Sequence, residues 1–252
     1  MIVVNNVIEL KRLINQRIDE QGPNCDLNDI DVRRLTDMSF LFSSSSFTGD
    51  ISKWDTSNVK NMYGMFEYSV FDGDISKWNV SKVENMLRMF SLSSFNGDIS
   101  KWDTSNVKTM NFMFNSSQFN GDISDWNVSK VEDMGFMFSS SQFTGDLSKW
   151  NVGRVENMAG MFSDSNFNGD LSKWDVSRVR SMNLMFARSP FKGDLSKWDV
   201  SNVRTMSYMF LDSQFTGDLS MWDTSSVKDM NGMFYLSPLS GKEPDWWRAR
   251  LK

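Results

Sequence analysis

The stretch FTGDISKWDTSNVKNMYGMF, residues 47–66, decides the fold because the chain repeats it at a fixed spacing. Residues 71–90 read FDGDISKWNVSKVENMLRMF, and residues 95–114 read FNGDISKWDTSNVKTMNFMF, each 24 residues after the one before. Self-similarity at such a period is typical of proteins that stack many copies of one small unit. We therefore expect most of the recurring residues to serve the unit itself rather than a chemical site.

The repeat can be followed over most of the chain without an insertion or a deletion. At its start Cys25, Asp26 and Leu27 take the places of Gly, Asp and Ile, and at its end Leu239 replaces a phenylalanine. A terminal unit must face water on one side, so altered ends are expected. The sequence predicts about nine 24-residue coils over residues 25–241. The tryptophan row marks their register: Trp54, Trp78, Trp102, Trp126, Trp150, Trp174, Trp198 and Trp222.

Each unit has the pattern of a turn, a short strand, a second turn and a short helix. Residues 53–56 combine an aromatic and a β-branched residue and are predicted to be a strand. Val59, Met62 and Phe66 recur at the spacing of one face of a short helix or 3₁₀ segment over residues 59–66. Stacking would then place successive strands parallel to each other, about 4.8 Å apart.

Distinct segments flank the repeat. In residues 1–24 we expect an N-terminal capping helix, with Asn6 and Glu9 as a capping box and Gly22-Pro23 as its end. Its apolar face would cover the open end of the core. Residues 242–252 are expected to form a C-terminal cap through Trp246 or Trp247. The residues of the helix's apolar face are Val7, Leu10, Ile14 and Ile18.

The composition argues against several classes of protein. The 252 residues carry a net charge of −5, no histidine and one cysteine, Cys25. These features disfavour an enzyme, a cofactor or metal site and a nucleic-acid partner. No apolar run approaches about 18 residues, so membrane insertion is not expected. The start of the chain lacks the features of a signal peptide, which by itself favours a cytoplasmic location.

The half-unit V-x-x-M-x-x-M-F-x-x-S resembles the V-x-x-I-x-x-x-A-F-x-x-C half of the BspA-like leucine-rich repeats of bacterial surface proteins. The W-[DN]-[TV]-S segment resembles a methionine-rich branch of that family. The resemblance implies an α/β solenoid, a right-handed leucine-rich-repeat-like stack. It also implies a non-catalytic role in adhesion or host contact at the cell surface or outside the cell, through a protein or glycan partner. The alternative is an intracellular protein-interaction scaffold. The oligomeric state stays open.

Two recurring polar rows admit a structural or a functional interpretation. The aspartate after each glycine, as in Asp50, is expected to cap a turn, because one Gly-Asp per unit is far too sparse for a calcium-binding repeat. The lysine row that includes Lys53 is expected to be a solvated charge ladder. The methionines are expected in the core rather than around a soft metal.

Recognition in a repeat protein must use the positions that differ from unit to unit. If residues 59–66 are helical, position 64 of the unit points away from the core. It carries glycine in three units. The alternative is that these side chains tuck under the next loop. A basic group near the C-terminal end (Arg178, Arg180, Arg188, Lys192 and Arg204) is too small and too mixed with aspartate to indicate nucleic acid. The candidate partner-binding residues at position 64 are Phe40, Arg88, Phe112, Phe136, Leu184 and Tyr208.

Overall fold

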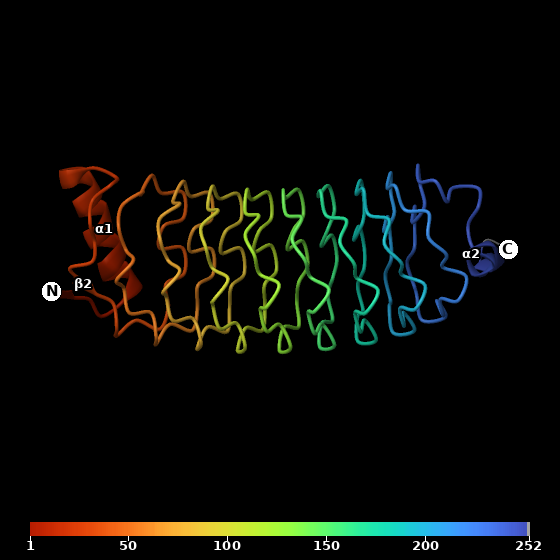
Figure 1. Cartoon of the computed structure of the whole chain (residues 1–252), viewed down its shortest axis with the longest axis horizontal. Helices are drawn as coiled ribbons and strands as arrows, with labels where there is room; N and C mark the ends of the chain where they lie inside the picture. Colours follow the sequence, from red (N-terminus) through yellow and green to blue (C-terminus); the bar gives the residue numbers. More distant parts are fainter. Residues whose placement is uncertain (251–252) are drawn as a thin grey trace.

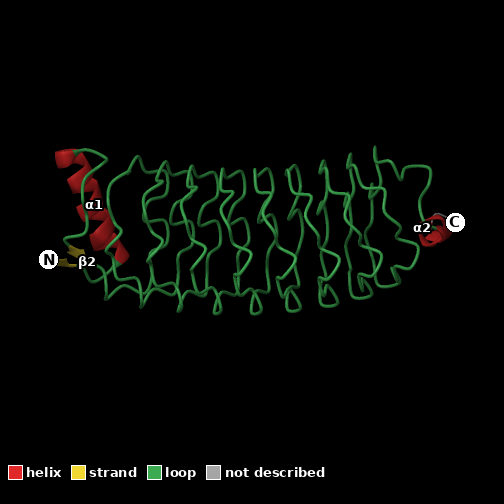
Figure 2. Cartoon of the chain, in the orientation of Figure 1, coloured by secondary structure: helices red, strands yellow, loops and turns green. Residues whose placement is uncertain are grey.

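The chain winds into an elongated stack of coils with its two termini at opposite ends (Figure 1). The structure is a computed structural model that describes residues 1–250. Its regular elements are strand β1 (Ile2–Val3), helix α1 (Val7–Gln21), strand β2 (Ile30–Asp31) and helix α2 (Asp245–Arg250). Within the described residues everything between β2 and α2 consists of turns and loops (Figure 2).

Hydrogen bonds between neighbouring coils hold the stack together. Isolated parallel bridges join residues 24 apart: one joins Asp26 to Asp50, and a continuous row runs from Asp37–Asn61 to Thr205–Asp229. Beyond each bridge, every second residue donates its N–H to the next coil. Met62 donates to the Asn85 carbonyl, for example, at 2.9 Å. The period of 24 therefore predicts which residues pair, and the coils pair in parallel.

The predicted helix over residues 59–66 is wrong. Gly64 and Tyr68 have positive φ angles of 58° and 56°, and a right-handed helix cannot pass through such residues. The N–H of Met65 reaches back to the Met62 carbonyl at 3.2 Å, closing a tight turn. The segment is a succession of turns whose remaining N–H groups bond to the next coil. Its apolar residues are nevertheless buried, as their spacing predicts.

The predicted strand at residues 53–56 is also wrong. Lys53 lies in a turn, and the N–H of Trp54 bonds to the Ile51 carbonyl at 3.2 Å instead of to a neighbouring coil. The parallel bridges form at Asn61 and its equivalents. The pairing therefore forms at a polar position, while residues 53–56, which have strand propensity, bury only Trp54 and Thr56.

The interior is filled by rows of identical side chains. Phe66 stacks on Phe90 with ring centroids 5.6 Å apart, and Trp54 stacks on Trp78 at 6.2 Å. Each buried indole N–H also donates to a carbonyl of the preceding coil, as Trp126 does to Ile99 at 3.1 Å. This bond gives the buried indole N–H an acceptor, while the same carbonyl also accepts the backbone N–H of the tryptophan three residues later. The tryptophan therefore recurs for its hydrogen bond as well as for its bulk.

The aspartate after each glycine caps a turn, as predicted. The N–H of Ser52 donates to the Asp50 carboxylate at 2.8 Å, and the equivalent bond recurs along the row. These hydrogen bonds lower the pKa of each carboxyl. The glycine before each aspartate has a packing role. At Gly49 a Cβ atom would overlap the Cys25 carbonyl oxygen.

Helix α1 covers the N-terminal end of the stack. The Asn6 side chain accepts from the N–H of Glu9 at 2.9 Å, and the Glu9 carboxylate accepts from the N–H of Asn5. In the expected capping box the Glu9 carboxylate would accept from the N–H of Asn6, whereas here it accepts from the residue before. Leu10 and Ile14 are buried, Val7 and Ile18 pack beside them, and Gly22 ends the helix with a φ of 89°.

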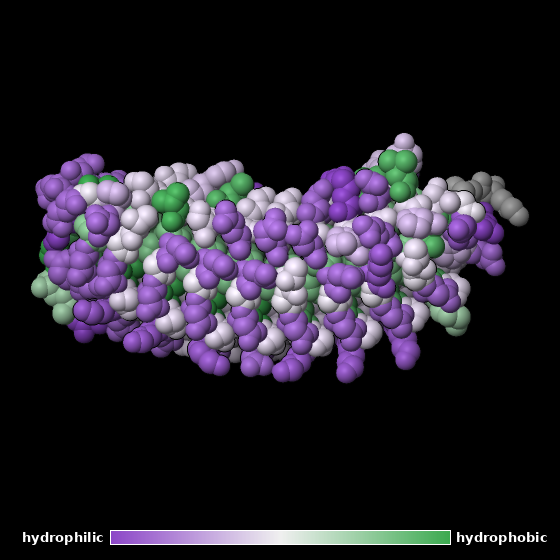
Figure 3. Space-filling view, turned by 45° about the horizontal axis from the view of Figure 1, so that its top comes forward, coloured by the Kyte–Doolittle hydropathy of each residue, from purple (hydrophilic) through white to green (hydrophobic). Residues whose placement is uncertain are grey.

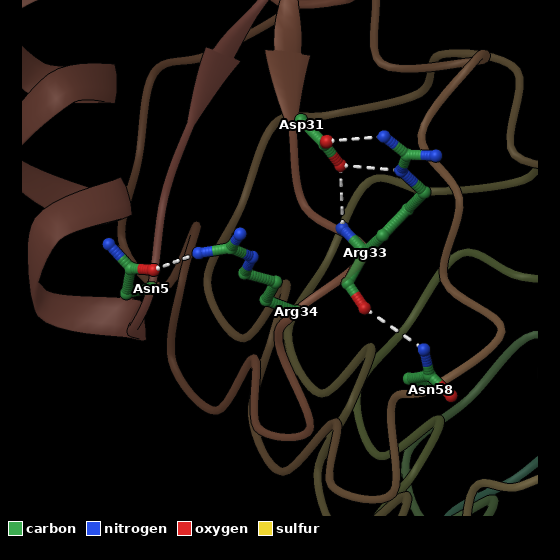
Figure 4. A network of polar contacts seen from close by, with 5 residues as sticks. All are labelled: Asn5, Asp31, Arg33, Arg34 and Asn58. Atoms are coloured by element: carbon green, nitrogen blue, oxygen red, sulfur yellow. Dashed lines mark hydrogen bonds and ion pairs between the residues drawn. The ribbon is translucent and has the colours of Figure 1, made fainter.

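A polar network fixes the residues around α1 and β2 to the coils (Figure 4). Arg33 makes two hydrogen bonds to the Asp31 carboxylate, at 2.9 and 2.7 Å, and these lower the pKa of Asp31 to about 2. Arg34 donates to the Asn5 side chain at 2.9 Å, and Asn58 in the next coil donates to the Arg33 carbonyl at 3.0 Å. The network therefore ties three successive segments together.

Helix α2 lies at the opposite end. Trp246 continues the tryptophan row, donating its indole N–H to the Leu219 carbonyl at 2.8 Å. Trp247 packs edge-on against Phe234 with centroids 5.2 Å apart. Both tryptophans are partly buried. Of the predicted C-terminal cap, residues 251–252 lie outside the described residues.

Candidate functional site

The position-64 row is a line of left-handed residues along the outside of the stack. Every member has a φ between 54° and 59°, including bulky ones such as Phe112 and Tyr208. A non-glycine residue in this conformation costs about 1–2 kcal/mol. The inter-coil bond of its N–H compensates: Phe112 donates to the Gly135 carbonyl at 2.9 Å. The same backbone geometry therefore displays a different side chain in each coil.

Three neighbouring members form one contiguous group, which we call the aromatic cluster: Arg88, Phe112 and Phe136. The two rings stack with centroids 4.8 Å apart and planes 10° apart. The Arg88 guanidinium lies 4.9 Å from the centre of the Phe112 ring, a cation–π contact, and pairs with the Glu67 carboxylate at 3.1 Å. All three side chains are partly exposed.

The glycines of the row make room for the ring of the preceding coil. A Cβ atom at Gly160 would overlap the Phe136 ring, and one at Gly64 would lie 2.6 Å from the Phe40 ring. The rings thus lean over the next coil and keep part of their surface in water. Phe112 and Phe136 are each more buried than exposed. Their rings therefore do not point straight away from the core, which is closer to the second of the two descriptions that the sequence left open.

The six candidates do not form one continuous stripe. Phe40 packs on Tyr63 at 4.4 Å between ring centroids, and Lys11 of helix α1 donates to its carbonyl at 3.0 Å. Gly64 separates Phe40 from the aromatic cluster. Beyond Gly160 come Leu184, which is partly buried, and Tyr208, which is 44% exposed. The structure therefore brings together three of the six candidates.

A second outer row lies in the loop after each Met-Phe pair, which also varies from unit to unit. Position 68 of the unit also has positive φ throughout, and it exposes Tyr68 (58%) and Leu92 (41%) on adjacent coils. Val70 beside them is 51% exposed. Isolated apolar side chains stand out along one margin of the stack, whereas hydrophilic side chains cover most of the face shown in Figure 3. In the sequence, this row can be recognised because position 68 differs from unit to unit while the Met-Phe pair before it recurs.

The predicted basic group divides into separate parts. Arg178, Arg180 and Arg204 line one groove. Arg188 instead pairs with the Asp164 carboxylate at 2.7 Å on the position-68 row, which lowers the pKa of Asp164. Lys192 does not line that groove. The shared groove places three of the five predicted basic residues on one surface.

The described residues offer little for metal or thiol chemistry. Within residues 1–250 no three His, Cys, Asp or Glu side chains gather at a possible metal site. Cys25 is free and buried, and burial raises the pKa of its thiol. Neither α1 nor α2 has the length and apolar character that crossing a bilayer requires.

Comparison with known proteins places the chain in a family that itself lacks an assigned role. The family model described as "Mycoplasma protein of unknown function, DUF285" matches residues 9–117, 91–166 and 163–246. Three overlapping matches within one chain agree with a repeat protein. No curated protein and no solved structure matches the chain.

Proposed function

The chain belongs to the DUF285 family of Mycoplasma proteins of unknown function, and we propose that it is a non-catalytic recognition module. In this proposal it binds a protein or glycan partner through the outer surface of its repeats. The setting is adhesion or contact with a host cell. No cofactor takes part.

The aromatic cluster is the observation that carries the proposal. Two stacked, partly exposed rings and an arginine offer apolar contact and positive charge at one place. Aromatic and arginine side chains contribute most strongly at protein interfaces, and aromatic rings also stack on sugars. Every coil adopts this left-handed backbone conformation, but the fold does not require an aromatic side chain there, since glycine stands at the same position in three other coils.

We also propose that the coil stack is a right-handed leucine-rich-repeat-like solenoid of the BspA-like type. Support comes from the parallel inter-coil bridges, the buried V-x-x-M-x-x-M-F pattern and the period of 24. The bacterial surface proteins of that type give the adhesion setting. The absence of histidine and of any metal-site cluster among residues 1–250 agrees with a binding role.

A pull-down with the purified chain tests the cluster. Phe112→Ala/Phe136→Ala is compared with wild type and with Tyr235→Ala, which removes an aromatic ring that is 60% exposed outside the row. We expect the same partner with wild type and Tyr235→Ala and its loss with the double variant. Thermal melts check that all three chains are folded. Undiminished recovery with the folded double variant would refute the proposal.

Fractionation of the cells that make the protein tests the setting. Adhesion requires the chain at the cell surface or in the medium. Detection in the cytosol alone would replace adhesion with an intracellular scaffold, while the pull-down result would still decide whether the aromatic cluster binds.

A further inference from the structure

Two adjacent outer rows run along the stack at positions 58 and 60 of the unit. Members of the position-60 row are joined by direct backbone bonds: Arg180 donates to the Glu156 carbonyl and Arg204 to the Arg180 carbonyl, both at 2.8 Å. Their side chains therefore emerge one coil apart, about 5 Å from one another. Charges at that spacing interact strongly with their neighbours.

In the first five coils acidic side chains interrupt these two rows, although cationic side chains remain in excess. The position-60 row alternates at first, as Lys60, Glu84, Lys108 and Glu132. Lys108 pairs with Glu84 at 2.6 Å, and Lys82 donates to the Asn58 side chain at 2.8 Å. Over positions 58 to 156 the two rows carry five cationic and three acidic side chains: Lys60, Lys82, Lys108, Lys130 and Arg154 against Glu84, Glu132 and Glu156.

In the last three coils the two rows carry only positive charge. We call Arg178, Arg180, Arg204 and Lys228 the basic groove, because they line an open groove of about 740 Å³. Glu156 at its edge pairs with Arg180 at 3.2 Å. Within residues 1–250 Arg178, Arg204 and Lys228 form no ion pair.

Other polar groups lie in or beside the basic groove. Asp175 feels the charge of Arg178, but its carboxylate already accepts from the Ser177 hydroxyl and N–H at 2.6 and 3.1 Å. Asn202, Ser225 and Ser226 line the same groove and offer side-chain hydrogen-bonding groups. Like charges stacked at coil spacing repel one another, and an anionic ligand laid along them would relieve this repulsion.

We propose that the basic groove binds an acidic peptide segment of a partner protein. Three of its four cationic groups are guanidinium forks, which match carboxylates in bidentate fashion. No aromatic residue lines the groove, so it lacks the stacking platform of single-stranded nucleic-acid sites and of many glycan sites. The net charge of −5 opposes a long polyanion such as duplex DNA. This second surface is independent of the aromatic cluster.

A labelled ten-residue polyglutamate peptide is the probe, titrated by fluorescence anisotropy at about 0.1 M salt against the full chain. Arg180→Ala/Arg204→Ala removes two charges from the groove. The matched control Lys60→Ala/Lys108→Ala removes two charges from the same row, where glutamates alternate with the lysines. Because the control site lies several coils away, beyond the screening length of about 10 Å, we expect it to change Kd less than about twofold. The groove variant is expected to weaken binding roughly tenfold.

Further titrations distinguish an acidic peptide from a glycan or a nucleic acid as the ligand. Phe112→Ala/Phe136→Ala should leave peptide binding unchanged, which separates this proposal from the previous one. Heparin and single-stranded DNA of equal charge are titrated as competitors. The proposal is overturned if either one binds more tightly than the peptide, if the two charge variants weaken peptide binding equally, or if wild type does not bind the peptide.

Discussion

The interior and the outer surface of this stack follow opposite rules. Inside, one residue type fills a row from end to end, as the phenylalanines that include Phe66 and Phe90 do at 5.6 Å spacing. Outside, the position-64 row changes from arginine to phenylalanine to glycine over a constant backbone conformation. Each coil packs only on its neighbours, so identical coils stack best inside. The difference teaches that stability and recognition can be separated by row in this molecule.

The largest expected effect comes from breaking an interior row. Phe138 is fully buried and contacts the rings of Phe114, Phe143 and Phe162. We expect Phe138→Ala to lower the free energy of unfolding by about 3–5 kcal/mol, measured by chemical denaturation. Lys130→Ala in the same coil should cause no measurable change. An equal effect of the two substitutions would contradict the separation by row.

Removing one interior hydrogen bond should have a smaller effect. Trp126→Phe removes the indole donor to the Ile99 carbonyl, which keeps its bond from the Trp102 N–H, and puts a smaller ring in the core. We expect a cost of about 1–3 kcal/mol in unfolding free energy for the lost bond and the lost volume. Trp246→Phe deletes the equivalent bond at the partly buried end of the stack, where water can replace it. The end variant should therefore lose less stability. A larger loss at Trp246 would count against this explanation.

A double-mutant cycle measures the contact between Phe136 and Gly160, two neighbours on the position-64 row. Gly160→Ala places a Cβ on a residue with a φ of 59° and against the Phe136 ring, and we expect a cost of about 1–2 kcal/mol or more. In a Phe136→Ala background only the backbone part of that cost should remain. Denaturation of all four chains measures the coupling. A coupling of zero would mean that the ring does not lie over Gly160.

The smallest effect is expected from the turn-capping aspartates, and it depends on pH. Hydrogen bonds from the serine two residues later hold their pKa below the ordinary value. Because the folded pKa is depressed, their contribution is present above about pH 4 and is lost as the pH falls through the folded pKa. We expect the melting temperature to fall in that acid range. Asp98→Asn/Asp122→Asn/Asp146→Asn keeps an acceptor but does not titrate, so its melting temperature should fall less. An unchanged acid profile would contradict the prediction.

The sequence predicts the pairing and the burial better than the local structure. The period of 24 identifies the partners of each bridge, and the Gly-Asp step predicts the turn cap at Asp50. The strand at residues 53–56 and the helix at residues 59–66 are wrong because bonds to the next coil, rather than local propensity, set the backbone. The left-handed conformation of residues such as Tyr68 cannot be predicted from the sequence, since tyrosine rarely adopts it.

The candidate site was predictable only in part for the same reason. Variation at a fixed position identifies Phe112 and Phe136, but a helical premise gives their direction incorrectly. Variation also marks Tyr68 and Leu92, but their exposure depends on the second left-handed position in each coil, which the sequence does not show. The basic groove depends on the alignment of positions 58 and 60 across three coils, and alternating charges earlier in the same rows obscure it.

Site-specific photo-crosslinking tests the central assignment most directly. A benzophenone amino acid is placed at Phe112 in one chain and at Lys101, in a different turn of the coil, in another, and each is irradiated with extract of the cells that hold the partner. We predict a discrete crosslinked product from the Phe112 site that excess unlabelled wild type removes, and none from Lys101. A specific product from Lys101 alone, or equal products from both sites, would contradict recognition through the position-64 row.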